Sequence, residues 1–341
     1  MKLRPYQKTI IEIGKQTLLT KGFVYLAMEV RTGKTLTSLG ISQEVKASKV
    51  LFITKKKAIS SIQDDYELFN PDFDLSVINY ESLHKIPKYN WDVVICDEAH
   101  SMGAFPKPSK RAKQVKVLLK HNNPYVILLS GTPTPESFSQ MYHQVFGIPN
   151  NPFAQYKNFY RFSDDYINVK VKPIGGLQIR DYSNGHESII NKMQPCMINF
   201  SQKNAGFKVE TTEEILYVRM KDATYSLAKK LQKNLVVEGE SEVILGDTPV
   251  KLMSKLHQIY SGTVKFESGN SMVLDLTKAE FIKKNFADKK IAIFYKFKEE
   301  LNAIKEVYGE TISTELSVFK ETNKSIALQI VSGREGISLK E

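Results

Sequence analysis

The run Thr32-Gly33-Lys34-Thr35 has the residue types that bind phosphate groups. It follows an apolar stretch, Phe23–Met28, that is typical of a buried strand, and a helical pattern begins directly after it. Backbone N–H groups at such a helix start face an anion, Lys34 would reach the β- and γ-phosphates, and Thr35 would bind Mg²⁺. The complete pattern has Gly where this chain has Met28, and a bare Gly-Lys-Thr is common by chance. The run alone therefore does not establish a nucleotide site.

Two adjacent carboxylates, Asp97 and Glu98, follow the apolar run Val93–Cys96. Ligands of α/β sheets bind at the carboxyl ends of strands, which is where this pair would lie. Asp97 would hold Mg²⁺, and Glu98 would orient and polarise the water that attacks a phosphoryl group. His100 could couple this pair to Ser130-Gly131-Thr132, although a single histidine is more often packed or solvated. A surface Asp-Glu pair is also frequent, but this interpretation weakens once the phosphate-binding run is considered with it.

Short apolar runs alternate with helical patterns over the first 150 residues. The expected strands are Phe23–Met28, Val50–Thr54, Leu75–Ile78, Val93–Cys96 and Val126–Leu129. Helical stretches such as Thr35–Val45 and Ile59–Phe69 separate them. This order predicts an α/β domain with a mostly parallel sheet, whose strand ends would carry the two groups above.

Residues 151–210 have a different composition, and we interpret them as an inserted α/β or hairpin element that bridges two domains. A hairpin is expected around residues 174–177. The segment mixes basic and aromatic side chains: Tyr156, Tyr160, Arg161, Phe162, Tyr166, Lys170, Lys172, Arg180 and Tyr182. Such a mixture could stack on and clamp nucleic acid, or it could form a small satellite core with a solvated rim. The sequence leaves both interpretations open.

A second α/β pattern begins near residue 211. The expected strands are Glu214–Arg219, Ile291–Tyr295 and Ile326–Val331, and the expected helices are Ala223–Asn234, Val250–Tyr260 and Glu299–Tyr308. With 341 residues and 42% apolar residues, the chain can form two globular cores.

The composition also bounds the classes of partner. The net charge of +11 favours a polyanion such as nucleic acid, although the lysines near Lys110–Lys120 are better explained as one solvated helix face. No run of eighteen apolar residues occurs, so we expect no membrane span and no membrane partner. Cys96 and Cys196 are too far apart for a metal-binding spacing and are expected to be ordinary thiols.

In combination, the Asp97-Glu98-Ala99-His100 sequence, Gly33-Lys34-Thr35 and Ser130–Pro133 resemble the helicase superfamily 2. Details look closest to its Snf2-like branch, including small bacterial and bacteriophage members. Further segments that resemble family motifs, in the family's order, are Leu3–Gln7, Leu51–Lys55, Val77–Leu83, Lys255–Gly262, Lys290–Tyr295 and Ser332–Leu339. The resemblance covers nearly the whole chain.

The resemblance implies two RecA-like P-loop lobes with ATP and Mg²⁺ between them, at residues 1–150 and 211–341. The implied ATP-binding residues are Gln7, which would read adenine, Arg31, Thr32, Gly33, Lys34 and Thr35. Contacts to nucleic acid, or a coupling path to it, are implied for Lys55, Lys56, Tyr80, His100, Ser130, Thr132 and Arg334. For the two lysines plain surface charge is equally plausible, and Tyr80 is more typical of a packed ring.

The implied function is an ATP-driven translocase or helicase, monomeric, on DNA, and duplex DNA in particular, in a bacterial or phage-infected cytoplasm. An RNA helicase is the first alternative. Arg31 and Arg334 stand where the family usually has glycine, and the chain ends at Glu341, before the family's arginine-rich last motif. Arginine fingers of that kind contribute roughly 10³–10⁵ in rate. We therefore expect either a fragment with an incomplete second lobe, or a nucleic-acid-binding or partner-docking module that binds ATP and hydrolyses it poorly.

Overall fold

The structure is a computed structural model that describes residues 3–86, 90–174, 177–207 and 212–330. The chain divides into two compact units, residues 1–211 and 212–341. No helix among the described residues combines the length and apolar composition that crossing a membrane requires.

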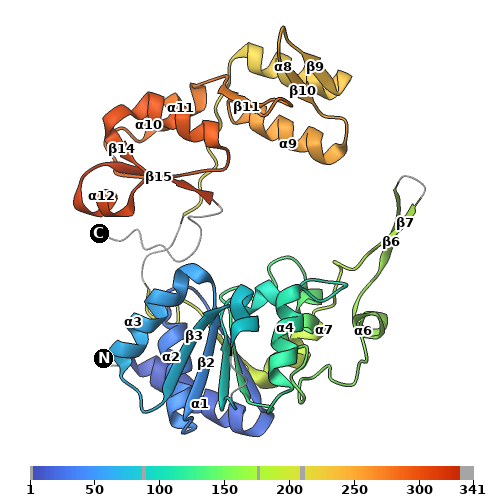
Figure 1. Ribbon diagram of the computed structural model, residues 1–341, viewed down its shortest axis with the longest axis vertical. Coiled ribbons are helices and arrows are strands. Elements are labelled where there is room, and N and C mark those ends of the chain that lie inside the picture. The colour runs from blue at the N-terminus through green and yellow to red at the C-terminus, as the bar shows by residue number, and fades with distance from the viewer. Residues whose placement is uncertain (1–2, 87–89, 175–176, 208–211, 331–341) are drawn as a thin grey trace. The chain divides into compact units, whose positions relative to one another are not determined.

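The first unit is built on a six-stranded sheet in the order β3-β2-β4-β5-β1-β8, with every pair of neighbours parallel (Figure 1). Its strands are β1 (Phe23–Met28), β2 (Lys49–Thr54), β3 (Asp74–Asn79), β4 (Val93–Cys96), β5 (Tyr125–Leu129) and β8 (Met197–Phe200). The central strands are continuous apolar runs because a parallel sheet is covered on both faces. All six residues of β1 are buried. The predicted α/β class with a parallel sheet is confirmed.

Helices cover both faces of this sheet (Figure 1). Those on one face are α1 (Pro5–Lys21), α2 (Lys34–Glu44) and α3 (Ile59–Phe69), and those on the other include α4 (Lys110–Leu119), α5 (Met141–Gln144) and α7 (Ser188–Met193). Successive side chains of a strand point to opposite faces. Tyr25 accordingly joins the core under α4 and α5, while Val24 and Leu26 join the core under α1 and α2.

Two glycines set the spacing between α1 and α2. A Cβ on Gly14 would overlap the side chain of Ile41, and a Cβ on Gly40 would overlap that of Ile11. Each helix therefore places a large side chain against the backbone of the other, which fixes the position of α2 relative to α1. This matters for the site because α2 begins at Lys34.

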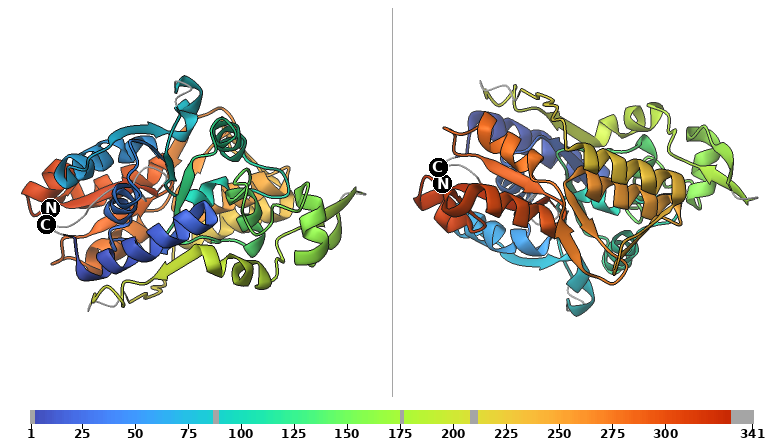
Figure 2. Two further views of the ribbon diagram at one scale, coloured as in Figure 1. Left: turned by 90° about the horizontal axis from the view of Figure 1, so that it is seen from below. Right: turned by 90° about the horizontal axis from the view of Figure 1, so that it is seen from above.

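Residues 151–200 extend the first unit. They contain α6 (Phe159–Tyr166), the hairpin of β6 (Lys170–Ile174) and β7 (Leu177–Asp181), α7 and β8. Most of the aromatic side chains named above pack together: the Phe162 ring lies 5.0 Å from that of Tyr166, and both join the core under α5. The satellite-core interpretation therefore describes these rings, while the hairpin projects from the unit with Lys170 and Arg180 exposed (Figures 1 and 2).

The structure thus groups residues 151–207 with the first unit rather than between the two units. The physical reason is β8, which pairs with β1 from Tyr25 to Met28 and completes the sheet. Sequence patterning did not indicate this strand, because it is only four residues long and follows a polar, aromatic segment.

The second unit has two small cores, one formed by the elements up to β12 and one by those that follow. Its elements are α8 (Asp222–Asn234), β9 (Val236–Glu238), β10 (Val243–Leu245), α9 (Pro249–Tyr260), β11 (Thr263–Lys265), β12 (Ser271–Val273), α10 (Thr277–Asn285), β13 (Ala292–Tyr295), α11 (Lys298–Tyr308), β14 (Ile312–Ser313), α12 (Leu316–Glu321) and β15 (Ser325–Gln329). Strands β13, β15 and β14 form a parallel sheet in that order.

One expected strand of the second unit is wrong. Residues 214–219 form no regular secondary structure, and the side chains of Ile215 and Tyr217 are 76% and 86% exposed. A short apolar run such as residues 215–218 forms a strand only where a neighbouring strand supplies hydrogen bonds and a core covers it.

Candidate nucleotide site

The loop between β1 and α2 has the backbone of a phosphate-binding loop. Gly33 precedes the helix with φ 82° and ψ 39°, and Lys34 is the first helical residue. A Cβ on residue 33 would lie 2.5 Å from Nε2 of Gln7, so glycine is required there by both conformation and space. Arg31 has φ 64° and is exposed. This left-handed backbone explains why glycine is usual at position 31 and shows that the arginine accommodates the same turn.

The ammonium group of Lys34 lies inside this loop. Its Nζ donates to the carbonyl oxygens of Met28, at 2.9 Å, and Glu29, at 3.3 Å. Burial lowers the pKa of Lys34, while Glu98 and Asp97 act in the opposite direction. A partly desolvated cation beside the N-terminus of a helix suits a phosphate group.

Residues near the N-terminus support the loop from one side. Gln7 is 3% exposed; its Nε2 donates to the carbonyl of Gly33 at 3.3 Å, and its Oε1 accepts from the backbone N of Arg4 at 2.9 Å. The Tyr6 hydroxyl donates to the carbonyl of Thr32 at 3.1 Å. Thr32 is buried, and its hydroxyl donates to the carbonyl of Glu29 at 2.7 Å. In this structure Gln7 and Thr32 hold the loop through their side chains.

The segment after β8 supports the loop from the other side, which the sequence did not indicate. The Glu29 carboxylate accepts from the backbone N of Gln202 at 2.7 Å, and the Gln202 side chain donates to the carbonyl of Val30 at 2.9 Å. Tyr6 also stacks on Phe200, with 4.7 Å between ring centres. These partners are more than 170 residues apart along the chain, so local patterning gives no signal for them.

The carboxylate of Asp97 is held between the carboxyl ends of strands β2 and β4. The Thr54 hydroxyl donates to Oδ2 of Asp97 at 2.7 Å. Burial raises the pKa of Asp97, and the hydrogen bond from Thr54 opposes that rise. Tyr80 is fully buried, and its hydroxyl donates to the backbone carbonyl of Asp97 at 2.7 Å. Tyr80 thus supports the strand that carries Asp97, and its buried ring is not accessible to nucleic acid. The sequence analysis did not identify Thr54 as a site residue, although Thr54 ends a predicted strand.

The second carboxylate faces a histidine. Nδ1 of His100 lies 3.2 Å from Oε2 of Glu98 and 2.9 Å from Oγ of Ser130. Ser130 Oγ also accepts from the backbone N of Thr132 at 3.1 Å. A Cβ on Gly131 would lie 3.7 Å from Nζ of Lys34. The strand ends that carry the phosphate-binding run, the two carboxylates and the Ser130-Gly131-Thr132 run therefore meet at one edge of the sheet.

A family model of the SNF2-related domain matches residues 41–267, which is more than half of the chain. The chain belongs to the SNF2-related family. A search of curated protein sequences finds no match.

Two solved structures of Sulfolobus solfataricus resemble this SNF2-related chain. The SWI2/SNF2 ATPase core in complex with double-stranded DNA aligns with a TM-score of 0.50 at 17% identity, over 96% of this chain and 78% of that one. The SWI2/SNF2 ATPase core domain aligns with a TM-score of 0.50 at 16% identity, over 96% and 76%. At such identities the likeness concerns the fold, and it confirms the predicted RecA-like α/β class.

The remaining predicted residues of this SNF2-related chain differ in their exposure. Lys55 is half-buried, Lys56 is exposed in the short 3-10 turn Lys56–Ala58 after β2, and Thr132 is exposed after β5. Thr35 is half-buried in the first turn of α2. Arg334 and the segment around it lie outside the described residues.

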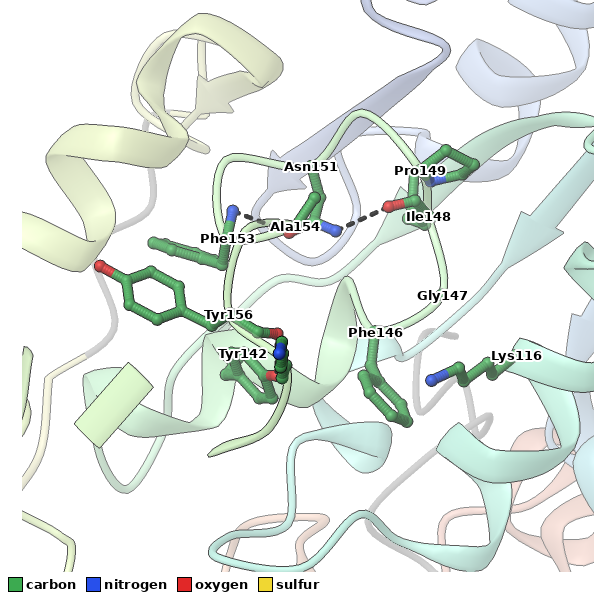
Figure 3. A pocket seen from close by; sticks show the side chains of 11 residues that line it. Lys116, Tyr142, Phe146, Gly147, Ile148, Pro149, Asn151, Phe153, Ala154 and Tyr156 are labelled. Carbon is green, nitrogen blue, oxygen red and sulfur yellow. Dashed lines mark hydrogen bonds between the residues drawn. The ribbon is translucent and has the colours of Figure 1, made fainter. Parts of the chain in front are cut away.

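The first unit also has a cavity of about 310 Å³ between α4 and the segment that follows α5 (Figure 3). Nζ of Lys116 lies 3.5 Å from the centre of the Phe146 ring, a cation–π contact at one wall. Gly147 permits this approach with φ 100°, because a Cβ there would overlap Lys116. None of the residues predicted to bind nucleotide lines this cavity, so it is separate from the candidate site.

Proposed function

We propose that this chain is a nucleic-acid-dependent ATPase that translocates along duplex DNA. The observation that carries the proposal is that Lys34, which follows a loop that requires Gly33, meets Asp97 and Glu98 at one edge of a parallel sheet. Family membership supports the ATPase, and the double-stranded DNA in the complex of the similar Sulfolobus core supports the choice of track.

The residues fit a nucleotide and Mg²⁺. Gly33 gives the loop its left-handed turn, Lys34 supplies a partly buried cation, and Thr35 and Asp97 supply the hard oxygen ligands that Mg²⁺ prefers. Bound Mg·ATP would provide the phosphoanhydride bond that water cleaves. Gln7, which borders the loop, is our candidate for reading adenine.

The chain's own groups then have distinct tasks. Lys34 would neutralise charge on the outer phosphates. Thr54 holds Asp97 in one orientation by its 2.7 Å hydrogen bond. Glu98, held beside His100, would orient and polarise the attacking water.

Nucleic acid would bind at the neighbouring strand ends. Lys55, Lys56 and Thr132 follow β2 and β5 and are candidate contacts to backbone phosphates, with Arg334 as a candidate from the second unit. The net charge of +11 favours such contacts. Binding should be salt-dependent and tolerant of sequence, because phosphate contacts carry no sequence information.

The test is ATP hydrolysis by the full chain with duplex DNA, single-stranded DNA, RNA or no nucleic acid. We expect duplex DNA to stimulate turnover most, and Lys34→Ala and Glu98→Gln to abolish it. Glu98→Gln should retain ATP binding, because it removes the water-activating carboxylate but leaves the phosphate loop intact.

Lys15→Ala and Glu44→Gln are the matched controls. These residues form a surface ion pair of 3.1 Å between α1 and α2, so the same substitution types there should leave turnover unchanged. Stronger stimulation by RNA would make the chain an RNA-directed motor. Tight ATP binding without turnover would make it a binding module, and no nucleotide binding would overturn the proposal.

A further inference from the structure

The cavity beside α4 combines aromatic rings with positive charge (Figure 3). Its volume is about 310 Å³. The side chains that define its chemistry are Lys116, Tyr142, Phe146, Phe153, Tyr156 and Lys157. Among the described residues, no Asp or Glu lines this cavity. Two lysines and four rings without a carboxylate favour an anion that carries a flat apolar group.

The side chain of Lys116 is held in place by its neighbours. Figure 3 shows its ammonium group directed at the Phe146 ring, with Nζ 3.5 Å from the ring centre. A Cβ on Gly147 would lie 2.7 Å from Cγ of Lys116, so the lysine stem packs directly against the backbone there. The position of the ammonium group is therefore fixed from two sides.

This ammonium group has no negative partner in the part of the chain that the structure describes, and neither has that of Lys157. Burial lowers the pKa of Lys116, and the charge of Lys120 acts in the same direction. Partial burial of a charge is unfavourable unless an opposite charge compensates for it. An anion bound in the cavity would supply that compensation.

Hydrogen bonds within the segment that follows α5 fix the opposite wall. Nδ2 of Asn151 donates to the carbonyl of Ile148 at 2.6 Å, and its Oδ1 accepts from the backbone N of Phe153 at 2.8 Å (Figure 3). The Tyr142 hydroxyl donates to the carbonyl of Tyr156 at 3.1 Å. The cavity is thus formed before a ligand enters, which reduces the cost of ordering on binding.

We propose that this cavity binds one nucleotide unit, with the base against the aromatic rings and the phosphate at Lys116 and Lys157. Aromatic side chains stack on every base, and lysine binds phosphate as a point charge. Ligand pockets span roughly 300–1,000 Å³, so a cavity at the lower end suits one base with one phosphate. A free mononucleotide and one nucleotide of an unpaired strand present the same groups.

The proposal does not rest on the proposed function, because the cavity shares no residue with the candidate nucleotide site. Isothermal titration calorimetry with thymidine 5′-monophosphate measures the binding. The full chain should carry Lys34→Ala in every titration, so that the phosphate loop contributes as little as possible. We expect saturable binding of one nucleotide per chain.

Two substitutions separate the two halves of the ligand. Lys116→Met removes the ammonium group and should weaken binding about tenfold or more, the size of one hydrogen bond to a charged group. Phe146→Leu removes a ring and should weaken binding about fivefold or more, the size of one stacking contact. Thymidine, which lacks the phosphate, should bind to the unaltered cavity about as weakly as the monophosphate binds to Lys116→Met.

Lys113→Met and Phe138→Leu are the matched controls. Lys113 is exposed on the same helix as Lys116, and Phe138 is half-buried against the same core as Phe146, but neither lines the cavity. We expect both to bind the monophosphate with unchanged affinity. Thermal unfolding checks that each variant is folded.

Lys157→Met provides a second charge variant that does not depend on packing, because Lys157 is exposed. It should fold even if Lys116→Met does not, and should weaken binding about threefold, as expected for an exposed charge. Binding that the folded Lys116, Lys157 and Phe146 variants leave unchanged would overturn the proposal. Absence of saturable binding would overturn it as well.

Two further ligands complete the test. Inorganic phosphate should bind more weakly than the monophosphate; equal affinity would overturn the proposal, since the cavity would then be a plain anion site. A thymidine oligonucleotide identifies the source of the ligand. If Lys116→Met and Phe146→Leu weaken its binding too, an unpaired strand enters the cavity. If they weaken only the binding of the monophosphate, the cavity takes free nucleotides. Failure of ATP hydrolysis in the unaltered chain would leave these results untouched.

Discussion

The two sides of the candidate site are built from different kinds of hydrogen bond. On the phosphate-loop side, side chains bind backbone carbonyls: Gln7 donates to Gly33, Thr32 to Glu29 and Lys34 to Met28. On the carboxylate side, side chains also bind side chains: Thr54 donates to Asp97 and His100 contacts Ser130, in addition to the bond from Tyr80 to the backbone carbonyl of Asp97. The loop side thus depends on backbone conformation, and the carboxylate side depends on particular side-chain atoms.

This difference explains which departures from the family pattern the chain accommodates. Met28 and Arg31 stand where glycine is usual, yet the loop keeps its left-handed turns at residues 31 and 33. A loop held by backbone hydrogen bonds tolerates such side-chain changes as long as its backbone conformation is kept. The contacts of Thr54 with Asp97 and of His100 with Ser130 have no such freedom, because each side chain has a fixed number of protons to donate.

Among changes to the residues that support the site, the largest effect should come from Gly33→Ala, which alters the backbone of the loop side. Alanine at φ 82° is strained, and its Cβ would lie 2.5 Å from Nε2 of Gln7, so loop and glutamine must both shift. A displacement of about 1 Å at a phosphate site can lower the rate about 10²-fold. We expect a loss of that size in kcat/KM for ATP, measured in steady-state hydrolysis assays.

Gly269→Ala is the control that separates the effect of backbone strain from that of the collision with Gln7. Gly269 has φ 97° with no atom within 4 Å of an added Cβ, so it carries the backbone strain without the collision. It should lower thermal stability while leaving kcat/KM unchanged. Equal losses of activity in the two variants would mean that the loop is not built on the conformation of Gly33.

The isosteric substitutions Thr54→Val and Thr37→Val each remove one hydroxyl, the first from the carboxylate side and the second from the loop side. Thr54 donates to the Asp97 carboxylate at 2.7 Å, whereas Thr37 donates to the backbone carbonyl of Gly33 at 2.9 Å. Hydrogen bonds to charged groups contribute about 1.5–3 kcal/mol, and those between neutral groups about 0.5–1.5 kcal/mol. We expect Thr54→Val to lower kcat by about tenfold or more, and Thr37→Val to act mainly on thermal stability. The reverse order would contradict the division of the site into two kinds of construction.

The parts of the site that could be predicted from sequence are those that lie together along the chain. Gly33 and Lys34 adjoin one strand, and Asp97, Glu98 and His100 adjoin another, so a few consecutive residues carry the signal. Gln202 gave no signal, because it looks like any polar residue after a short strand. Only the fold brings it to Glu29, 173 residues away along the chain.

The strands also differ in whether the sequence alone could predict them. Five strands of the first unit were predicted to within one residue at each end. For β1, β2, β4 and β5 the reason is that a strand buried on both faces must be a continuous apolar run. Strand β8 was missed because its four residues depend on β1 for their pairing. The expected strand at residues 214–219 is wrong for the converse reason, since this apolar run pairs with no neighbouring strand.

The smallest effect should come from Arg31→Gly, which tests whether the loop side is built by backbone alone. Glycine would remove the left-handed strain at φ 64°, worth about 1–2 kcal/mol, but would lose about 0.5–1 kcal/mol in backbone entropy. The two terms nearly cancel, so the free energy of unfolding should change by no more than about 1 kcal/mol, and the KM for ATP by less than about threefold, equivalent to a similar energy. Denaturant titration and hydrolysis assays measure the two quantities. A large rise in KM with unchanged stability would show instead that the exposed guanidinium binds phosphate, and the loop side would then rely on a side chain after all.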